Sequence, residues 1–525
     1  MYFHVNGKNK THSNKDAGGV YLSVDNWNDF SFVTMFNLSL HDEQGTYHDI
    51  GKVKIGFIGQ TNQISTHSKL HVAFPYLGSE FFSLGQGTDY YRKMAALPNG
   101  YGKKVLTALR DMVVDPNIVD EVKDEEVFKI SLLRDTSLSM VRGQYVRVLD
   151  GQAELTNFKF KFHRPEADDL GEISIKFNVI AESTPSTNVH AVIGRNGVGK
   201  TTLLNGMIEA ITYRKGPGRF LDSSGWTTSE IAEDYFSGLV SVSFSAFDPF
   251  SPPQEQPDPS KGTCYSYIGL KDPEKKDRHK TIAELQIDCV KSLSACFRSP
   301  EKKARWLNAI QKLGSDENFS RMRLEQLVNV FLGIEVNHPH VGQSDTREFL
   351  DQYLQLALPY LSKMSSGHAI VLLTITRLVE VVQEKTLVLL DEPESHLHPP
   401  LLSAFIRALT ELLYEQNGVA IVATHSPVVL QEIPKSCAWK VYRTGKSITV
   451  KNPDIETFGE NVGLLTSDVF SLEVERSGFH SLLIKDVAAG ESYDQVLGKY
   501  NQQLGSEGRS ILSSLIAHRE REKQS

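Results

Sequence analysis

Residues 194–201 have the types and the spacing that bind phosphate groups. They read GRNGVGKT and match the pattern G-x-x-x-x-G-K-[ST] in full. Glycines let the backbone curl so that successive N–H groups point at phosphates, and the lysine reaches the β- and γ-phosphates as a point charge. We therefore predict that the chain binds ATP through Gly194, Arg195, Asn196, Gly197, Val198, Gly199, Lys200, Thr201 and Thr202.

Two adjacent carboxylates, Asp391 and Glu392, follow the apolar run TLVLL at 386–390. A carboxylate at this place is suited to hold Mg²⁺, and we assign that role to Asp391 together with the hydroxyl of Thr201. The side chain of the next residue points elsewhere, so Glu392 is predicted to polarise the attacking water as the catalytic base. Two carboxylates in separate roles fit ATP hydrolysis with Mg²⁺ as the cofactor.

His425 stands at the end of a second apolar run, VAIVAT at 419–424. A lone histidine at the end of a strand is more often structural than functional. Here one predicted helix, at 401–413, separates it from the carboxylates, which places it on the neighbouring strand within reach of a γ-phosphate. We therefore predict a catalytic role for His425.

The turn Ser365-Ser366-Gly367 opens a predicted helix that runs through residue 378, and it offers a second grip for an anion. On its own the motif is weak, because Ser-Ser-Gly is also an ordinary helix cap. Its meaning therefore depends on the order of the motifs along the chain.

These residues need an α/β core to position them. A short strand at 190–193 precedes the phosphate loop, and the helix that begins at Lys200 adds its positive N-terminal end. The runs at 386–390 and 419–424 are typical of parallel strands buried on both faces, and open α/β sheets bind ligands at the C-terminal ends of such strands. The predicted fold class is α/β, with a mixed sheet.

The composition of successive segments predicts the domain boundaries. We divide the chain into a flexible N-terminal arm (1–18), a β-rich lobe that contributes to the ATPase sheet and contains a helix at 102–113 (19–187), a P-loop core (188–250), an inserted helical lobe (251–360), a core with the Ser-Ser-Gly turn, the carboxylates and His425 (361–440), and a C-terminal docking region (441–525). In the last segment Phe470, Phe479 and Leu483 are candidate anchors for a partner. Internal packing of the same side chains is an equal alternative.

The order of phosphate loop, Ser-Ser-Gly helix, carboxylate strand and histidine strand resembles the ABC-type ATPases. The stretches DEPESHLHPP and ATHSPVVLQEIP are similar to the RecF, SMC and OLD group within them. In such proteins the serine–glycine turn reaches the γ-phosphate held by the other subunit, so the resemblance implies that Ser365, Ser366 and Gly367 act in trans. It also implies a head-to-tail homo-oligomer with an even number of chains. The γ-phosphate would favour the associated state, and hydrolysis would let the chains separate.

The same resemblance has two departures from transporter ATPases. The turn reads M-S-S-G-H where transporters carry L-S-G-G-Q, and the strand predicted at 238–250 lacks their glutamine. Asp248 is the candidate to replace that glutamine as a magnesium contact.

Longer stretches resemble the PtuA ATPase subunit of Septu-type anti-phage systems, especially the version found beside retrons. They lie at 20–36, 81–91, 241–265 and 457–470. The resemblance implies a regulatory ATPase in antiviral defence with a PtuB-like HNH nuclease as partner, and in the retron version a reverse transcriptase with its RNA–DNA product. The chain itself is not predicted to be a nuclease, because no Asp-x-Asp pair follows Asp391 and Glu473 and Glu475 stand alone.

Composition excludes several classes of protein. The sequence has no apolar run of the roughly 18 residues that a membrane helix needs, and its first residues are polar, unlike a secretory signal. Its four cysteines are scattered without a C-x-x-C, which favours the reducing cytoplasm over a disulfide framework or a cysteine zinc site. We predict a cytoplasmic protein without a membrane partner.

The net charge of −8 restricts any DNA contact to a local patch. Candidate residues are Lys302, Lys303, Arg305, Arg321 and Arg323, although solvated helix faces explain them better. The pairs His338/His340 and His396/His398 lack a third metal ligand, so we expect the loop at 395–399 to meet a partner subunit instead.

Two other functions compete with the defence subunit. The first is a stand-alone DNA-repair ATPase of the RecF or SMC kind, which would bind DNA in an ATP-dependent way. The second is the energy subunit of a transporter, which the Ser-Ser-Gly turn and the missing glutamine disfavour.

Overall fold

The protein is described by a computed structural model that covers residues 1–7, 17–25, 32–134, 136, 140–151, 155–167, 170–225, 228–233, 235–245, 250–258, 262–273, 275, 278–337, 347–474 and 478–524. The chain divides into two compact units, residues 1–156 and residues 157–525. Each unit is described by itself.

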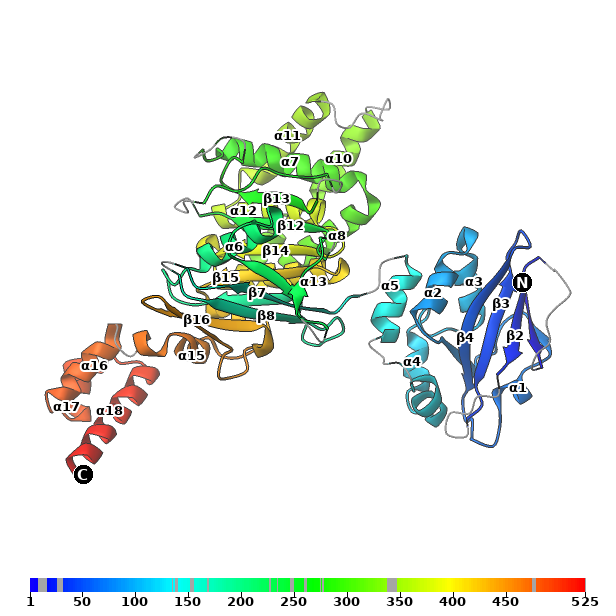
Figure 1. Cartoon of the computed structure of the whole chain (residues 1–525), viewed down its shortest axis with the longest axis horizontal. Helices are drawn as coiled ribbons and strands as arrows, with labels where there is room; N and C mark the ends of the chain where they lie inside the picture. The colour runs from blue at the N-terminus through cyan, green and yellow to red at the C-terminus, as the bar shows by residue number, and fades with distance from the viewer. Residues whose placement is uncertain are drawn as a thin grey trace. The chain divides into compact units, whose positions relative to one another are not determined.

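The first unit is built on a six-stranded sheet of order β5-β1-β2-β3-β4-β6 (Figure 1). The strands are β1 (Tyr2–Asn6), β2 (Gly19–Val24), β3 (Met35–His41), β4 (Tyr47–Phe57), β5 (Ala73–Phe74) and β6 (Phe81–Gly85). The helices are α1 (Thr66–Lys69), α2 (Thr88–Ala95), α3 (Tyr101–Ala108), α4 (Asn117–Val122) and α5 (Tyr145–Leu149). Apolar side chains of the strands and of α2 to α5 share one buried core.

Two predictions for this unit are wrong. The predicted flexible arm begins with a strand, because Phe3 is fully buried and β1 pairs with both β2 and β5. The predicted lobe at 19–187 is not one piece of the ATPase sheet, since β1 to β6 form a sheet of their own. The predicted helix at 102–113 exists but ends earlier, at Ala108, just before Arg110 adopts a left-handed backbone conformation.

The second unit contains the P-loop core, a seven-stranded sheet of order β13-β12-β14-β15-β9-β16-β17. Its strands are β9 (Val189–Ile193), β12 (Gly238–Ser243), β13 (Cys264–Gly269), β14 (Thr386–Asp391), β15 (Val419–Thr424), β16 (Ala438–Thr444) and β17 (Ser447–Lys451). All neighbours are parallel except β16 and β17. The mixed α/β fold class is confirmed.

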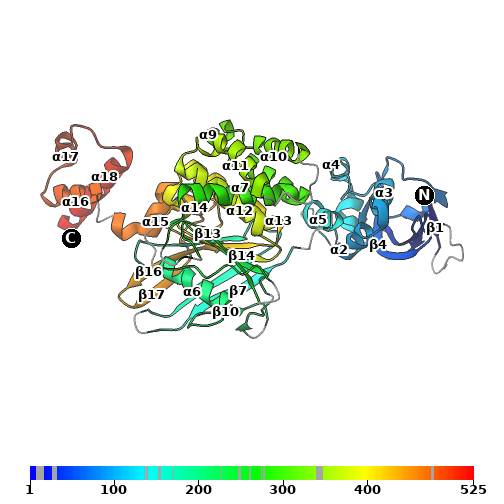
Figure 2. The ribbon, with the colours of Figure 1, turned by 90° about the horizontal axis from the view of Figure 1, so that it is seen from above.

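The two faces of this sheet are covered differently (Figure 2). On one face α6 (Lys200–Thr212) packs beneath an antiparallel sheet of order β11-β10-β7-β8, made of β7 (Phe158–Arg164), β8 (Ile173–Val179), β10 (Arg219–Asp222) and β11 (Ser229–Glu230). On the other face lie the helices α7 (Ile282–Arg298), α8 (Pro300–Leu313), α9 (Glu317–Arg321), α10 (Gln326–Asn337), α11 (Arg347–Leu361), α12 (Ser366–Val381) and α13 (Pro399–Glu415). Side chains of successive residues in the buried strands point to opposite faces of the sheet, so they pack alternately into the core on the α6 side and the core on the side of the other helices.

Both edges of the sheet come from segments that we assigned elsewhere. β13 lies inside the predicted helical lobe at 251–360, and most of β16 with all of β17 lies inside the predicted docking region at 441–525. The helical lobe therefore begins near Ile282. These edge strands were missed because they are short and only partly apolar, with burial alternating along β17.

The chain ends in helices. α14 (Pro427–Leu430) contacts α15 (Val462–Val474), and the buried ammonium of Lys440 ties α15 to the sheet through Asp468 at 3.0 Å. The helices α16 (Gly478–Ala488), α17 (Tyr493–Lys499) and α18 (Ser506–Gln524) form a small core of their own. None of the helices in the described ranges has the length and apolar character needed to cross a membrane.

Candidate functional site

The phosphate loop, the carboxylates and His425 meet at one edge of the seven-stranded sheet. The loop connects β9 to α6, and β15 lies between β9 and β14. The register pairs Thr424 with Ile193 and Asp391 with Ala423, so the three strands end level with one another. The C-terminal ends of parallel strands are where this kind of sheet binds ligands.

Three glycines shape the loop for different reasons. Gly197 and Gly199 have φ angles of +81° and +94°, which side chains rarely adopt, and no atom lies within 4 Å of a Cβ added at either. A Cβ at Gly194 would lie 2.5 Å from the carbonyl oxygen of Val441, so this glycine permits close packing against β16. The loop is thus curled and open on the side of Gly197 and Gly199, as a phosphate cradle requires.

The Lys200 ammonium is buried within the site. Nζ donates to the carbonyl oxygens of Gly194 at 3.0 Å and Arg195 at 3.1 Å, and it lies 3.5 Å from Oε1 of Glu392. The Lys200 side chain is 3% exposed and that of Glu392 is 30% exposed. The predicted phosphate-binding cation and the predicted base are therefore an ion pair.

Glu392 is held in an uncommon backbone conformation. Its φ of 45° and ψ of 58° are left-handed, a strained state for a residue with a side chain that clusters at functional sites. A contact with His425 and the positive charge of Lys200 lower the pKa of Glu392, although burial acts against them. The carboxylate is ionised at neutral pH, as a group that polarises water must be.

His425 contacts two carboxylates. Its Nδ1 lies 3.7 Å from Oε1 of Glu392 and 3.1 Å from Oε1 of Glu394. The same Glu394 oxygen accepts hydrogen bonds from Thr424 Oγ1 and from the His425 backbone N–H, both at 2.6 Å. The two carboxylates raise the pKa of His425, Glu392 more than Glu394.

Glu394 is a site residue that we did not predict. Its side chain is 6% exposed and orients His425 in both backbone and ring. Its position three residues after Asp391 in the stretch DEPE was the available signal.

The donor set fits magnesium. Thr201 at the start of α6 and Asp391 at the end of β14 supply oxygen, the ligand that Mg²⁺ prefers, and Mg²⁺ usually takes few protein ligands beside the phosphates of its nucleotide. Within the described ranges no group of three or more His, Cys, Asp or Glu side chains is placed to hold a metal. Asp248, the candidate replacement for the transporter glutamine, lies outside the described residues.

The Ser-Ser-Gly turn is the N-terminus of α12. Ser365 is the N-cap, Ser365 and Ser366 are exposed, and Gly367 is buried. A Cβ on Gly367 would lie 2.4 Å from the carbonyl oxygen of His396, so the glycine lets α12 pack on the segment after the carboxylates. The turn is open to solvent, while contact with a second chain stays a prediction.

The histidine pairs have different outcomes. His398 Nε2 lies 3.0 Å from Oδ2 of Asp316 in the same chain, although its side chain is about half exposed. His338 and His340 lie outside the described residues. A partner contact of the loop at 395–399 stays a prediction.

The candidate anchors of the docking region behave differently from one another. Leu483 is fully buried in the core of α16 to α18, so its role as an anchor is wrong. Phe470 is partly buried against the main core, and only Phe479, 43% exposed, is open to solvent.

Two of the five residues of the predicted basic patch make contacts within the chain. Lys302 Nζ donates to the Glu380 carbonyl oxygen at 2.7 Å, and Arg321 pairs with Glu317. A DNA contact through this patch stays a prediction.

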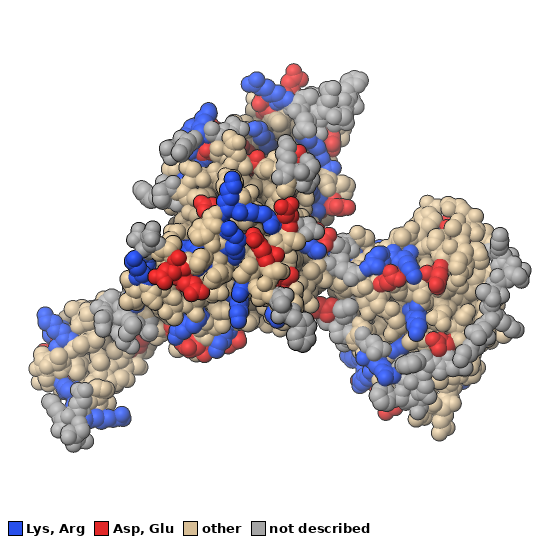
Figure 3. Space-filling view, viewed as in Figure 1, with Lys and Arg blue, Asp and Glu red and all other residues tan. Residues whose placement is uncertain are grey.

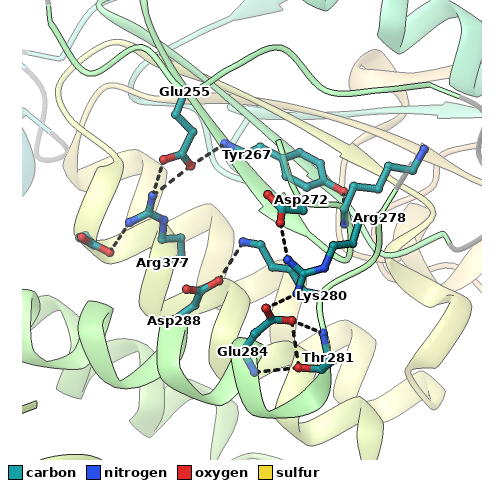
Figure 4. Close-up of polar contacts among 11 residues, drawn as sticks. Glu255, Tyr267, Asp272, Arg278, Lys280, Thr281, Glu284, Asp288 and Arg377 are labelled. Carbon is teal, nitrogen blue, oxygen red and sulfur yellow. Dashed lines mark hydrogen bonds and ion pairs between the residues drawn. The ribbon is translucent and has the colours of Figure 1, made fainter. Parts of the chain in front are cut away.

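A cavity of about 760 Å³ lies between β13, α7 and α12, and none of its lining residues belongs to the phosphate loop. Figure 4 shows several of its charged side chains paired with one another. Arg377 donates to both oxygens of Glu255 at 3.0 and 3.1 Å, and Lys280 pairs with Asp288 at 2.8 Å. We interpret this region as the joint that fastens α7 and the Ser-Ser-Gly helix to the sheet edge.

Comparisons with known proteins show which proteins this chain resembles. Residues 324–431, which span the Ser-Ser-Gly turn, the carboxylates and His425, match the family described as "AAA domain, putative AbiEii toxin, Type IV TA system". Protein ea59 of Escherichia phage lambda is 51% identical over 504 residues, which cover 96% of each chain.

Solved structures show lower overall likeness. The ADP form of MJ1267, an ATP-binding cassette of an ABC transporter, is 17% identical with a TM-score of 0.31, covering 62% of this chain and all of that one. UvrA2 from Deinococcus radiodurans is 16% identical with a TM-score of 0.27, covering 58% of this chain and 39% of that one.

Proposed function

Because the chain belongs to the family of phage lambda protein ea59 and carries an ATPase domain of the ABC/AAA type, we propose that it binds and hydrolyses ATP to control a partner nuclease. The observation that supports hydrolysis is the contact chain from Lys200 to Glu392 to His425 at the ends of three adjacent strands. It brings the side chains of Lys200, Glu392 and His425 close to one another, as hydrolysis by a phosphate-binding cation, a base and a polar sensor would require.

The residues divide the work of hydrolysis. The curled loop and Lys200 bind the triphosphate, and Glu392 accepts a proton from the attacking water. His425, oriented by Glu394, contacts the γ-phosphate and is held by the two carboxylates until ATP arrives. Magnesium held by Thr201 and Asp391 would neutralise charge on the phosphate oxygens.

A second copy of the chain completes the site in this proposal. Ser365 and Ser366 are exposed at the N-terminus of the 16-residue helix α12, an end that attracts anions. Two chains arranged head to tail would each present this turn to the ATP of the other, and hydrolysis would release the pair.

The nature of the partner rests on sequence resemblance. Septu-type systems pair an ATPase with an HNH nuclease, and retron versions add a reverse transcriptase with its RNA–DNA product. Phe479 is the exposed candidate for the nuclease contact. The antiviral role follows from the same resemblance.

ATP turnover and co-purification test the two parts of the proposal separately. The purified chain should hydrolyse ATP with Mg²⁺, and Lys200→Ala should abolish binding of a fluorescent ATP analogue. A matched variant of an exposed lysine, Lys215→Ala, should bind as the parent does. Expression with its neighbouring genes should retain a nuclease, and a chain purified without one would contradict the partnership.

The structure also favours a second candidate, an ATPase that binds DNA directly. The outer face of the β7–β8 sheet carries Lys159, Lys161 and Lys176, and a band of Lys and Arg runs down this side of the unit (Figure 3). Lys161 stands directly opposite Lys176, and like charges in such a pair destabilise a sheet unless an anion lies over them.

Salt dependence distinguishes this candidate. If DNA lies on that face, the Lys159/Lys161/Lys176 triple alanine variant should reduce the slope of log affinity against log salt by about 3. An unchanged slope, or no ATP-dependent DNA binding by the parent chain, would exclude it.

A further inference from the structure

A chain of polar contacts starts at the Ser-Ser-Gly turn. Ser365 Oγ lies 2.6 Å from Nδ1 of His368, and His368 Nε2 lies 3.3 Å from Oδ1 of Asp316. The second oxygen of Asp316 lies 3.0 Å from Nε2 of His398. One carboxylate from the helical lobe thus bridges the Ser-Ser-Gly helix and the segment that precedes α13.

The centre of this network is buried. The side chains of Asp316 and His368 are 5% and 9% exposed. Asp316 also caps α9 by accepting the backbone N–H of Phe319 at 2.9 Å. Burial opposes ionisation of Asp316, but the Phe319 N–H and His368 outweigh it and lower its pKa, so the carboxylate is ionised.

An ionised carboxylate only accepts hydrogen bonds, so His368 must donate to Asp316 from Nε2. In a neutral imidazole the other nitrogen, Nδ1, is then an acceptor. The Ser365 hydroxyl has to donate its proton to Nδ1 across the 2.6 Å contact. In this state the hydroxyl has no proton to offer to a phosphate.

Protonation of His368 reverses that contact. Both ring nitrogens of an imidazolium are donors, so Nδ1 donates to Ser365 Oγ and the hydroxyl proton becomes free to point outward. The described titratable groups that face His368 are Asp316 and His398, whose ring centroid is 6.2 Å from that of His368.

We propose that His368 is a positioning residue that sets the direction of the Ser365 hydroxyl, and that Asp316 fixes its tautomer. The occupant of the exposed turn is a triphosphate held by a second copy of this chain, so the inference rests on the proposed function. With neutral His368 the serine presents only lone pairs to the phosphate, and with imidazolium it donates a hydrogen bond. Assembly driven by ATP is therefore stronger at low pH.

ATP-dependent association measured between pH 6 and pH 8 tests this role. The experiment uses Glu392→Gln as background, so that hydrolysis does not interfere. We expect association of the parent to weaken about tenfold as pH rises, the value of one hydrogen bond to a charged group. His368→Gln, whose amide does not titrate, should make association nearly independent of pH.

Controls separate the inference from the proposed function. Ser365→Ala should remove the same pH dependence, whereas His71→Gln, an exposed histidine in the first unit, should keep it. Thermal unfolding shows whether His368→Gln folds. If it folds and its association depends on pH as steeply as that of the parent, the positioning role is wrong while the ATPase proposal stands. If the background chain binds no ATP, the proposed function itself fails.

Discussion

The ammonium nitrogen of Lys200 lies 3.5 Å from Oε1 of Glu392. Lys200 begins α6, which follows the phosphate loop after β9. Glu392 follows β14, and β15 is the one strand between β14 and β9 in the sheet. A triphosphate in the loop would compete with Glu392 for this cation. Binding of the nucleotide would then release Glu392 from Lys200. Substitution of either residue therefore tests the proposed mechanism.

Replacing Glu392 with glutamine should stop hydrolysis and preserve ATP binding. The amide keeps the shape of the side chain but accepts no proton, and loss of a general base lowers a rate by about 10² to 10⁴. We expect ATP-bound assemblies to accumulate, as measured by size-exclusion chromatography with radiolabelled ATP. Glu384→Gln, on the loop before β14, is the control, and parental turnover by Glu392→Gln would show that the base is another group.

A composite site should show complementation between two defective chains. Ser366→Arg places a bulky cation on the exposed turn, so this variant should not form an active pair with itself. Mixed with Lys200→Ala, it provides an intact phosphate loop while the other chain provides an intact turn, and about one site per pair should regain activity. Mixtures that stay inactive at every ratio would contradict action in trans.

The sequence predicted the parts of the site that depend on local pattern. The loop at 194–199, the strands at 386–391 and 419–424 and the helix after Ser365 all follow from spacing and apolar runs. Asp316 could not be found this way, because it meets His368 and His398 only after residues 52 and 82 positions away fold together. The helical lobe that brings it there has no motif of its own.

The contact of His425 with its carboxylates should make stability depend on pH. The pKa of His425 in the folded chain is raised above 6.5. Its contribution to the free energy of unfolding is therefore fully present below pH 6.5, and it is lost as the pH rises through the pKa of the folded state. The pKa of Glu392 in the folded chain is lowered below 4.5. Its contribution to the free energy of unfolding is therefore present above pH 4.5, and it is lost as the pH falls through the pKa of the folded state. The pair therefore stabilises the chain most between these limits.

Thermal unfolding at a series of pH values measures this effect. The melting temperature of the parent should exceed that of His425→Gln near pH 6, and the difference should shrink as pH rises through and beyond neutrality. His67→Gln, an exposed histidine of α1, should show no such trend. A difference that grows between pH 7 and pH 9 would have the wrong sign for a raised pKa.

Replacing Gly367 with alanine should destabilise the packing of α12 on the segment after the carboxylates. The added Cβ would lie 2.4 Å from the carbonyl oxygen of His396, and backbone on both sides leaves little room to move. Overpacking of this kind costs about 1–3 kcal/mol in the free energy of unfolding, measurable by urea denaturation. Gly333→Ala is the matched control, because nothing lies within 4 Å of its Cβ and alanine favours the helix by about 0.5–1 kcal/mol. If both variants were equally stable, the close approach of α12 to His396 would be wrong.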